Sequence, residues 1–228
     1  MFHPDEYISS LTRLLRTAFG ERLIYVGLQG SYLRGEATES SDIDVMVVID
    51  SMSVADLAAY RQAIASLPDA DKSCGFICGR DELLHWNPLE ICHLLHTTQD
   101  CFGTLKKLVP AYTQRDVRTY VQLSVGNLYH EVCHRRIHAS REDEETALPI
   151  TYKAVFYILQ NLHYLDAGEF LPTKEELLAA LSGLDRQVLE TAVAIRNGGV
   201  DHEAAFALLF AWCGETLARI SYHAGDAL

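Results

Sequence analysis

Two aspartates one residue apart begin an apolar run that otherwise has the composition of a β-strand. Asp42 and Asp44 flank Ile43, and the run continues to Ile49. Side chains alternate between the two faces of a strand, so both carboxylates project from one face, with Cα atoms roughly 6–7 Å apart. Carboxylates this close repel each other unless a cation lies between them. Mg²⁺ is the expected occupant, because it prefers hard oxygen ligands and is commonly shared with substrate phosphates.

A Gly-Ser turn precedes this strand and could hold those phosphates. Gly30 and Ser31 follow an apolar stretch from Leu23 to Leu28, which is predicted as a buried strand, and a short helical segment is expected after them. Backbone N–H groups at such a turn, together with a serine hydroxyl, bind phosphate oxygens. Glycine permits a close backbone approach that a side chain would block. A phosphate cradle followed by a pair of metal-binding acids predicts phosphoryl or nucleotidyl transfer.

The spacing of these elements resembles the signature of the nucleotidyltransferase superfamily, which has the DNA-polymerase-β-like fold. Ten residues separate Gly30-Ser31 from Asp42-Ile43-Asp44, and the segment between them, with Arg34 and Ser41, is similar to the family's usual sequence. The resemblance implies that the two aspartates hold the metals and that the Gly-Ser turn holds the triphosphate, with Arg34 and Ser41 contributing to nucleotide binding. A chance pair of aspartates at a strand edge is the alternative.

The resemblance also implies a third carboxylate from a neighbouring strand. Glu90 is the acid inside an apolar run, residues 89–95, that is predicted as a strand, and a half-buried glutamate needs a partner or a metal. The stretch from Asp81 to Glu90 resembles aminoglycoside nucleotidyltransferases, in which a glutamate acts as general base. Glu90 would then deprotonate the acceptor hydroxyl or complete the metal site; a solvent-facing edge position is the alternative. The other candidate acids are Asp69, Asp71, Asp81 and Glu82.

Three histidines recur at helical spacing further along the chain. His130, His134 and His138 lie four residues apart in a segment predicted as a helix, and the first two belong to an H-E-x-x-H string. This string is typical of zinc metalloproteases, which makes a metalloprotease a rival hypothesis. No third ligand follows at a familiar spacing, although Glu142 and Glu145 remain candidates. The other interpretation is a polar helix face that lines the substrate cleft.

The predicted elements divide the chain into two parts. In the first, helices are predicted from Pro4 to Gly20 and from Ser53 to Leu67, with strands at 23–28, 43–49, 72–78 and 89–95. In the second, helices are predicted at 116–138, 150–166, 174–181 and 184–222, with a charged linker at 141–145 and a break at 197–199. The predicted fold class is therefore α/β (α+β). A small mixed-sheet nucleotidyltransferase domain at residues 1–110 precedes a C-terminal helical bundle at 111–228, which binds the acceptor.

Composition limits the class of partner. The 228 residues carry a formal net charge of −12, which disfavours a nucleic-acid binder and is compatible with a cationic small molecule. The six cysteines form no C-x-x-C pair. The N-terminus lacks the layout of a signal peptide, and no run of eighteen apolar residues occurs. We therefore expect a cytoplasmic protein without a membrane span.

Together these features predict a Mg²⁺-dependent nucleotidyltransferase. It would move a nucleoside monophosphate from an NTP, with ATP as the expected co-substrate, to a hydroxyl of a small, cationic, aminoglycoside-like acceptor. Two alternatives remain open: a protein adenylyltransferase of the toxin–antitoxin type, and a non-catalytic nucleotide-binding module. The sequence does not determine the acceptor, the base of the nucleotide or the oligomeric state.

Overall fold

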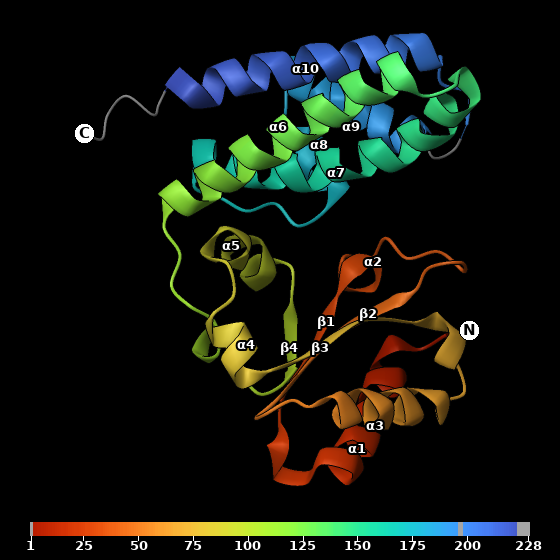
Figure 1. Ribbon diagram of the computed structural model, residues 1–228, viewed down its shortest axis with the longest axis vertical. Helices are drawn as coiled ribbons and strands as arrows, with labels where there is room; N and C mark the ends of the chain where they lie inside the picture. The colour runs from red at the N-terminus through yellow and green to blue at the C-terminus, as the bar shows by residue number, and fades with distance from the viewer. Residues whose placement is uncertain (1, 196–197, 223–228) are drawn as a thin grey trace. The chain divides into compact units, whose positions relative to one another are not determined.

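The chain forms two compact units, Met1–Tyr112 and Thr113–Leu228 (Figure 1). The computed structural model describes residues 2–195 and 198–222. The first unit combines a sheet with helices, whereas the described part of the second unit is helical. This arrangement confirms the predicted fold class.

The first unit is built on a four-stranded mixed sheet in the order β3-β2-β1-β4. β1 (Leu23–Gln29) pairs antiparallel with β2 (Ile43–Ile49) and with β4 (Gln99–Phe102), whereas β3 (Ser73–Gly79) pairs parallel with β2. In this register Gln29 lies opposite Asp44, and Asp44 lies opposite Cys74. The end of β1 therefore meets the beginnings of β2 and β3 at one end of the sheet.

Helices cover both faces of this sheet. α1 (Pro4–Phe19) and α3 (Val54–Ala65) pack on the face that carries Ile43, Val45 and Val47. α4 (Arg80–Leu84), α5 (Pro88–His96) and η3 (Leu105–Lys107) contribute to a second core around Met46 and Val48. Because side chains alternate along β2, Asp44 projects from the same face as Met46 and Val48. Asp42 precedes the first residue of the strand.

The predicted strand at residues 89–95 is wrong, because these residues lie in α5. Asn87 caps this helix, since its side chain accepts the Leu89 N–H at 3.2 Å, and Pro88 stands in the first turn. Proline at this position and asparagine before it are both typical of a helix start. The strand that pairs with β1 instead is β4, whose first three residues are exposed.

The second unit contains five helices within its described residues. They are α6 (Gln114–His138), α7 (Arg141–Ala167), α8 (Lys174–Ala180), α9 (Gly183–Ile195) and α10 (His202–Tyr222). The predicted linker at 141–145 is wrong: it is the first turn of α7, where Ser140 Oγ accepts the Asp143 N–H at 3.1 Å. Acidic side chains are stabilised at a helix N-terminus. The predicted break at 197–199 is confirmed at Gly198 and Gly199, which lie between α9 and α10, whereas Asn197 lies outside the described residues.

α10 is long and apolar enough to cross a membrane by length and composition alone. Its side chains Leu209, Trp212 and Cys213 are buried in the core that α10 shares with α6, α7 and α9. Trp212 also donates a hydrogen bond from Nε1 to Asp185 Oδ1 of α9 at 2.7 Å. Core packing within the second unit therefore accounts for the buried third of the apolar window of α10.

A hydrogen bond between Tyr25 and Asp100 joins β1 to the edge strand β4. The fully buried Tyr25 donates its hydroxyl to Asp100 Oδ1 at 2.8 Å, and Leu105 N–H donates to the same oxygen at 3.2 Å. We expect Tyr25→Phe to lower the free energy of amide opening in β1 and β4 by about 1.5 kcal/mol, because it removes a hydrogen bond to a charged acceptor. Native-state hydrogen exchange measures this loss strand by strand. Unchanged protection of both strands would contradict the prediction.

Candidate active site

The Gly-Ser turn and the acidic pair meet at one end of the sheet. Gly30 opens the short helix α2 (Gly30–Leu33) directly after β1, with φ at +71°. A Cβ atom on Gly30 would lie 1.9 Å from Asp44 Oδ2 and 2.7 Å from its Cγ. The turn therefore packs its backbone against the Asp44 carboxylate. Glycine is required here twice, for the left-handed backbone and for this contact.

Asp42 and Asp44 form the acidic part of the site. Asp42 is exposed and Asp44 is half-buried, so both carboxylates can be reached from solvent. No group of three His, Cys, Asp or Glu side chains is positioned to hold a metal ion among residues 2–195 and 198–222. Two carboxylates nevertheless suit Mg²⁺, which commonly takes one or two protein carboxylates and completes its shell with water and substrate phosphate. The donor set beside the Gly30 turn therefore fits a shared Mg²⁺.

Arg34 and Ser41 hold the loop between the turn and β2. Arg34 donates its backbone N–H to the Gly30 carbonyl at 3.3 Å, and its largely buried side chain pairs with Glu36 at 3.0 Å. Ser41 Oγ accepts the Thr38 N–H at 2.9 Å. Both side chains thus have local partners at the border of the site. Their contribution to nucleotide binding stays a prediction.

The position beside Asp44 on the neighbouring strand is occupied by a cysteine. Cys74 is the β3 partner of Asp44 in the parallel register, so it occupies the place where a third acid from β3 would stand. Burial raises the pKa of the Cys74 thiol, and the nearby Asp44 and Asp42 carboxylates raise it further. The thiol is therefore protonated at neutral pH. Sequence reasoning missed this position because it depends on the register between β2 and β3.

Glu90, the predicted third acid, lies in the first turn of α5 and not on a strand. Its side chain is exposed, and Oε2 accepts a hydrogen bond from Trp86 Nε1 at 2.5 Å. The Trp86 ring in turn stacks on Phe76 of β3, with ring centres 5.9 Å apart. The strand placement that singled out Glu90 is thus wrong. Its role as general base stays a prediction.

The other candidate acids lie at different ends of the sheet. Asp81 and Glu82 belong to α4, which follows the far end of β3, about 17 Å along the strand from Cys74. Asp69 and Asp71 are exposed and lie in the turn before β3, at the same end as Asp44. Topology therefore disfavours the first two as partners of the acidic pair and leaves Asp69 and Asp71 at the correct end.

Sequence reasoning also missed two histidines in the last turns of α5. Burial, together with the charges of Arg34 and His96, lowers the pKa of His93 to about 4; burial also lowers the pKa of His96. His93 is therefore neutral at physiological pH. Just beyond α5, Gln29 Nε2 donates to Thr98 Oγ1 at 2.8 Å. Residues of α5 and of the loop after it thus add polar groups to the sheet end that carries the Gly30 turn. The sequence hides them because the surrounding run is mostly apolar.

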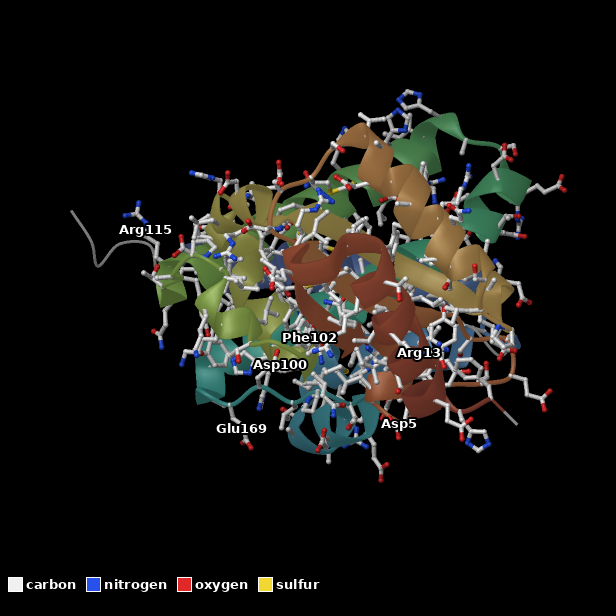
Figure 2. The ribbon with its side chains drawn as sticks, turned by 90° about the horizontal axis from the view of Figure 1, so that it is seen from below. Asp5, Arg13, Asp100, Phe102, Arg115 and Glu169 are labelled. Carbon is white, nitrogen blue, oxygen red and sulfur yellow. The ribbon has the colours of Figure 1, made fainter. Side chains whose placement is uncertain are left out.

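A groove of about 750 Å³ lies between α1 and β4. Figure 2 labels Asp5 and Arg13 on α1, and Asp100 and Phe102 on β4. Apart from Asp100, these residues line the groove, and the Arg16 guanidinium lies 4.6 Å from the centre of the Phe102 ring. None of the predicted site residues lines this groove. The candidate active site is therefore assigned to the sheet end and not to this groove.

The H-E-x-x-H string lies on α6, where its glutamate is engaged by other side chains. Glu131 Oε1 accepts hydrogen bonds from Arg135 Nε at 3.0 Å and from Thr151 Oγ1 at 3.2 Å. A metalloprotease requires this carboxylate to act on a zinc-bound water. With Glu131 bonded in this way, and with no three-ligand group in the described residues, the metalloprotease hypothesis lacks support.

Comparison with known proteins agrees with the assignment to the first unit. Residues 11–74 match the family model described as a nucleotidyltransferase domain. This segment runs from within α1 to Cys74 and includes the Gly30 turn and both aspartates. No curated protein matches the chain significantly. The chain therefore carries a nucleotidyltransferase domain.

Two solved structures resemble the chain. Spectinomycin adenyltransferase AAD(9) from Enterococcus faecialis, solved with ATP and spectinomycin, aligns with a TM-score of 0.60 at 17% identity, over 93% of this chain and 98% of that chain. A toxin-antitoxin structure with AMP-PNP aligns with a TM-score of only 0.33 at 20% identity, over 57% of this chain and 92% of that chain. The first alignment shows that the fold of both units is shared with an adenyltransferase.

Two glycines allow the Gly30 contact to be tested with an internal control. Gly30 and Gly35 have nearly equal φ values, +71° and +70°, but a Cβ on Gly35 would meet nothing within 4 Å. We expect both alanine variants to lose about 1–2 kcal/mol of stability through backbone strain. Only Gly30→Ala should also displace the Asp44 carboxylate and weaken binding of Mg²⁺ with a non-hydrolysable ATP analogue, measured by calorimetry. Equal binding losses in the two variants would contradict a specific role for the Gly30–Asp44 contact.

Proposed function

We propose that the chain transfers a nucleoside monophosphate from ATP, in a Mg²⁺-dependent reaction, to a hydroxyl of a small cationic acceptor. The observation that carries this proposal is the packing of the Gly30 turn against Asp44, beside Asp42, within the segment that matches a nucleotidyltransferase domain. The fold shared with an adenyltransferase solved with ATP and spectinomycin supports ATP as co-substrate and a spectinomycin-like acceptor.

In the proposed reaction the acceptor oxygen attacks the α-phosphorus, its proton passes to a base, and pyrophosphate leaves. Asp42 and Asp44 would hold the Mg²⁺, which would neutralise negative charge on the phosphates. The backbone N–H groups of Gly30 and Ser31 would orient the triphosphate. Arg34 and Ser41 would join the nucleotide site by exchanging their present local partners for phosphate oxygens.

Two acids are candidates for the general base of the proposed site. Resemblance alone favours Glu90, whose carboxylate accepts the Trp86 N–H on α5. The start of β3 offers the protonated thiol of Cys74 in place of an acid. Asp71, in the turn before β3, lies at the correct sheet end and is the structural alternative.

The net charge of −12 supports a cationic acceptor, because an acidic protein attracts cations from solution. We further propose that the helical second unit contributes acceptor-binding groups and that the protein is cytoplasmic.

The function is tested by combining each of the four NTPs with cationic antibiotics, spectinomycin among them, and with lysate proteins, while pyrophosphate release is measured. Release that requires ATP, Mg²⁺ and a small cationic acceptor would support the proposal. Labelling of a protein instead would indicate a protein adenylyltransferase, and nucleotide binding without release would indicate a binding module.

The two aspartates provide the central prediction for this activity. We expect Asp42→Asn and Asp44→Asn each to lower the transfer rate by about a hundredfold or more, because each removes a charged oxygen ligand of the metal. Stability should be unchanged or increased, since one of two repelling carboxylates is removed. Asp50→Asn is the matched control: this exposed acid follows the opposite end of β2 and pairs with Arg80. Near-normal turnover of either site variant at saturating Mg²⁺ would refute the assignment.

Glu90→Gln and Asp71→Asn separate the two candidates for the general base. A general base contributes roughly 10²- to 10⁴-fold, so the variant that removes it should lower kcat by about that factor while nucleotide affinity changes little. The loss should shrink as the pH rises, because hydroxide partly replaces a missing base. If Glu90→Gln leaves kcat unchanged, Glu90 is only the partner of Trp86. If it instead abolishes binding of Mg²⁺ and ATP, Glu90 acts on the metal and not on the acceptor.

A further inference from the structure

The last turns of α6 carry a row of exposed histidines that are not among the residues assigned to the candidate active site. His130, His134 and His138 lie along one face of the helix, and a hollow of about 500 Å³ beside them is also lined by Glu131 and Arg135. In the described part of the chain, His134 and His138 contact each other but make no hydrogen bond or ion pair. Their ring nitrogens are therefore available to an external ligand.

The spacing of one histidine pair suits a shared metal ion. Imidazole nitrogens bind Zn²⁺ at about 2.0–2.1 Å, which puts each ring centre about 3.2 Å from the metal. Two such rings have centres about 4.5 Å apart at a right-angled N–Zn–N geometry and about 5.2 Å apart at a tetrahedral one. The centres of His134 and His138 are 4.7 Å apart, within this range, whereas those of His130 and His134 are 6.0 Å apart.

The electrostatic surroundings favour a cation at this pair. α6 ends at His138, so the pair lies at the negative end of the helix dipole. The two arginines between the histidines are each balanced by acids. Arg135 pairs with Glu131 at 3.0 Å, and Arg136 pairs with Glu144 at 2.8 Å. No unbalanced positive charge on this turn therefore opposes a bound metal.

We propose that His134 and His138 form a binding site for a late first-row divalent metal ion, separate from the Mg²⁺ site of the first unit. Two imidazole nitrogens select zinc, copper or nickel over magnesium, which prefers oxygen ligands. Water completes the coordination in the open hollow, so this is not the closed four-ligand arrangement of a structural zinc site. Glu131 takes no part, since Arg135 and Thr151 engage its carboxylate. Metal binding would tie together the last two turns of α6 and stabilise the folded second unit.

Calorimetric titration of the full chain with Zn²⁺ tests this site. The titration uses a background with Cys74→Ser and Cys101→Ser, because these exposed thiols could also bind zinc. We expect His134→Gln and His138→Gln each to weaken the histidine site by about tenfold or more. The variant His85→Gln, which changes an exposed histidine directly after α4, should bind zinc as the background does. Helix content should be retained in both site variants, because glutamine is a good helix former.

A second readout is the midpoint temperature of thermal unfolding. Zn²⁺ should raise this temperature in the background protein but not in the His134→Gln variant. Equimolar Mg²⁺ should not produce this difference between the two proteins. Three results would overturn the proposal. They are the absence of saturable zinc binding in the background protein, equal affinity in all variants, and a loss in His130→Gln as large as that in His138→Gln, which would place the metal on the other pair.

Discussion

The close approach of Gly30 to Asp44 is the contact on which the arrangement of the first unit's site depends. A methyl group on Gly30 would overlap the Asp44 carboxylate, so the turn and the acid can meet only with glycine at this position. The contact follows from the antiparallel register in which Gln29 lies opposite Asp44. A slip of one residue would turn Asp44 toward the core under α1 and α3 and move Ile43 to the face that carries Met46 and Val48. The apolar pattern of β2 therefore fixes the position of the carboxylate as firmly as the position of the core.

The same register explains where this site departs from the expected three-acid arrangement. β3 runs parallel to β2, which places Cys74 beside Asp44. Gly75 follows with a φ of +110°, and a Cβ there would lie 2.1 Å from the Val45 carbonyl oxygen, so the two strands approach too closely for a side chain at that point. A protonated thiol beside the acidic pair adds no charge to a metal. β3 contains no carboxylate, so we propose that the base comes from outside this strand.

Much of the fold was predictable because strong local signals and tertiary structure agree. β2 is an apolar run apart from Asp44. α3 begins where Ser53 Oγ donates to Asp56 Oδ2 at 2.8 Å in a typical capping position. The type of α5 is ambiguous in the sequence, because an apolar run of seven residues fits a buried strand or a helix equally well; the helix-start signal at Asn87-Pro88 is what favours the helix. β4 gives no such signal, since it has four residues, of which the first three are exposed, and is too short to show an alternating pattern.

The Gly-Ser turn and the acidic pair were recognisable because their chemistry is local in the sequence. The strand register and the helix packing are needed to locate the Cys74 position, the low pKa of His93 and the contact of Gly30 with Asp44.

The central claim is that nucleotide and metal bind at this sheet end, and a crystal structure with Mg²⁺ and a non-hydrolysable ATP analogue tests it most directly. The account predicts metal density between Asp42 and Asp44, with phosphate oxygens over the Gly30 and Ser31 backbone. Nucleotide bound instead in the groove between α1 and β4, with no metal at the two aspartates, would contradict it.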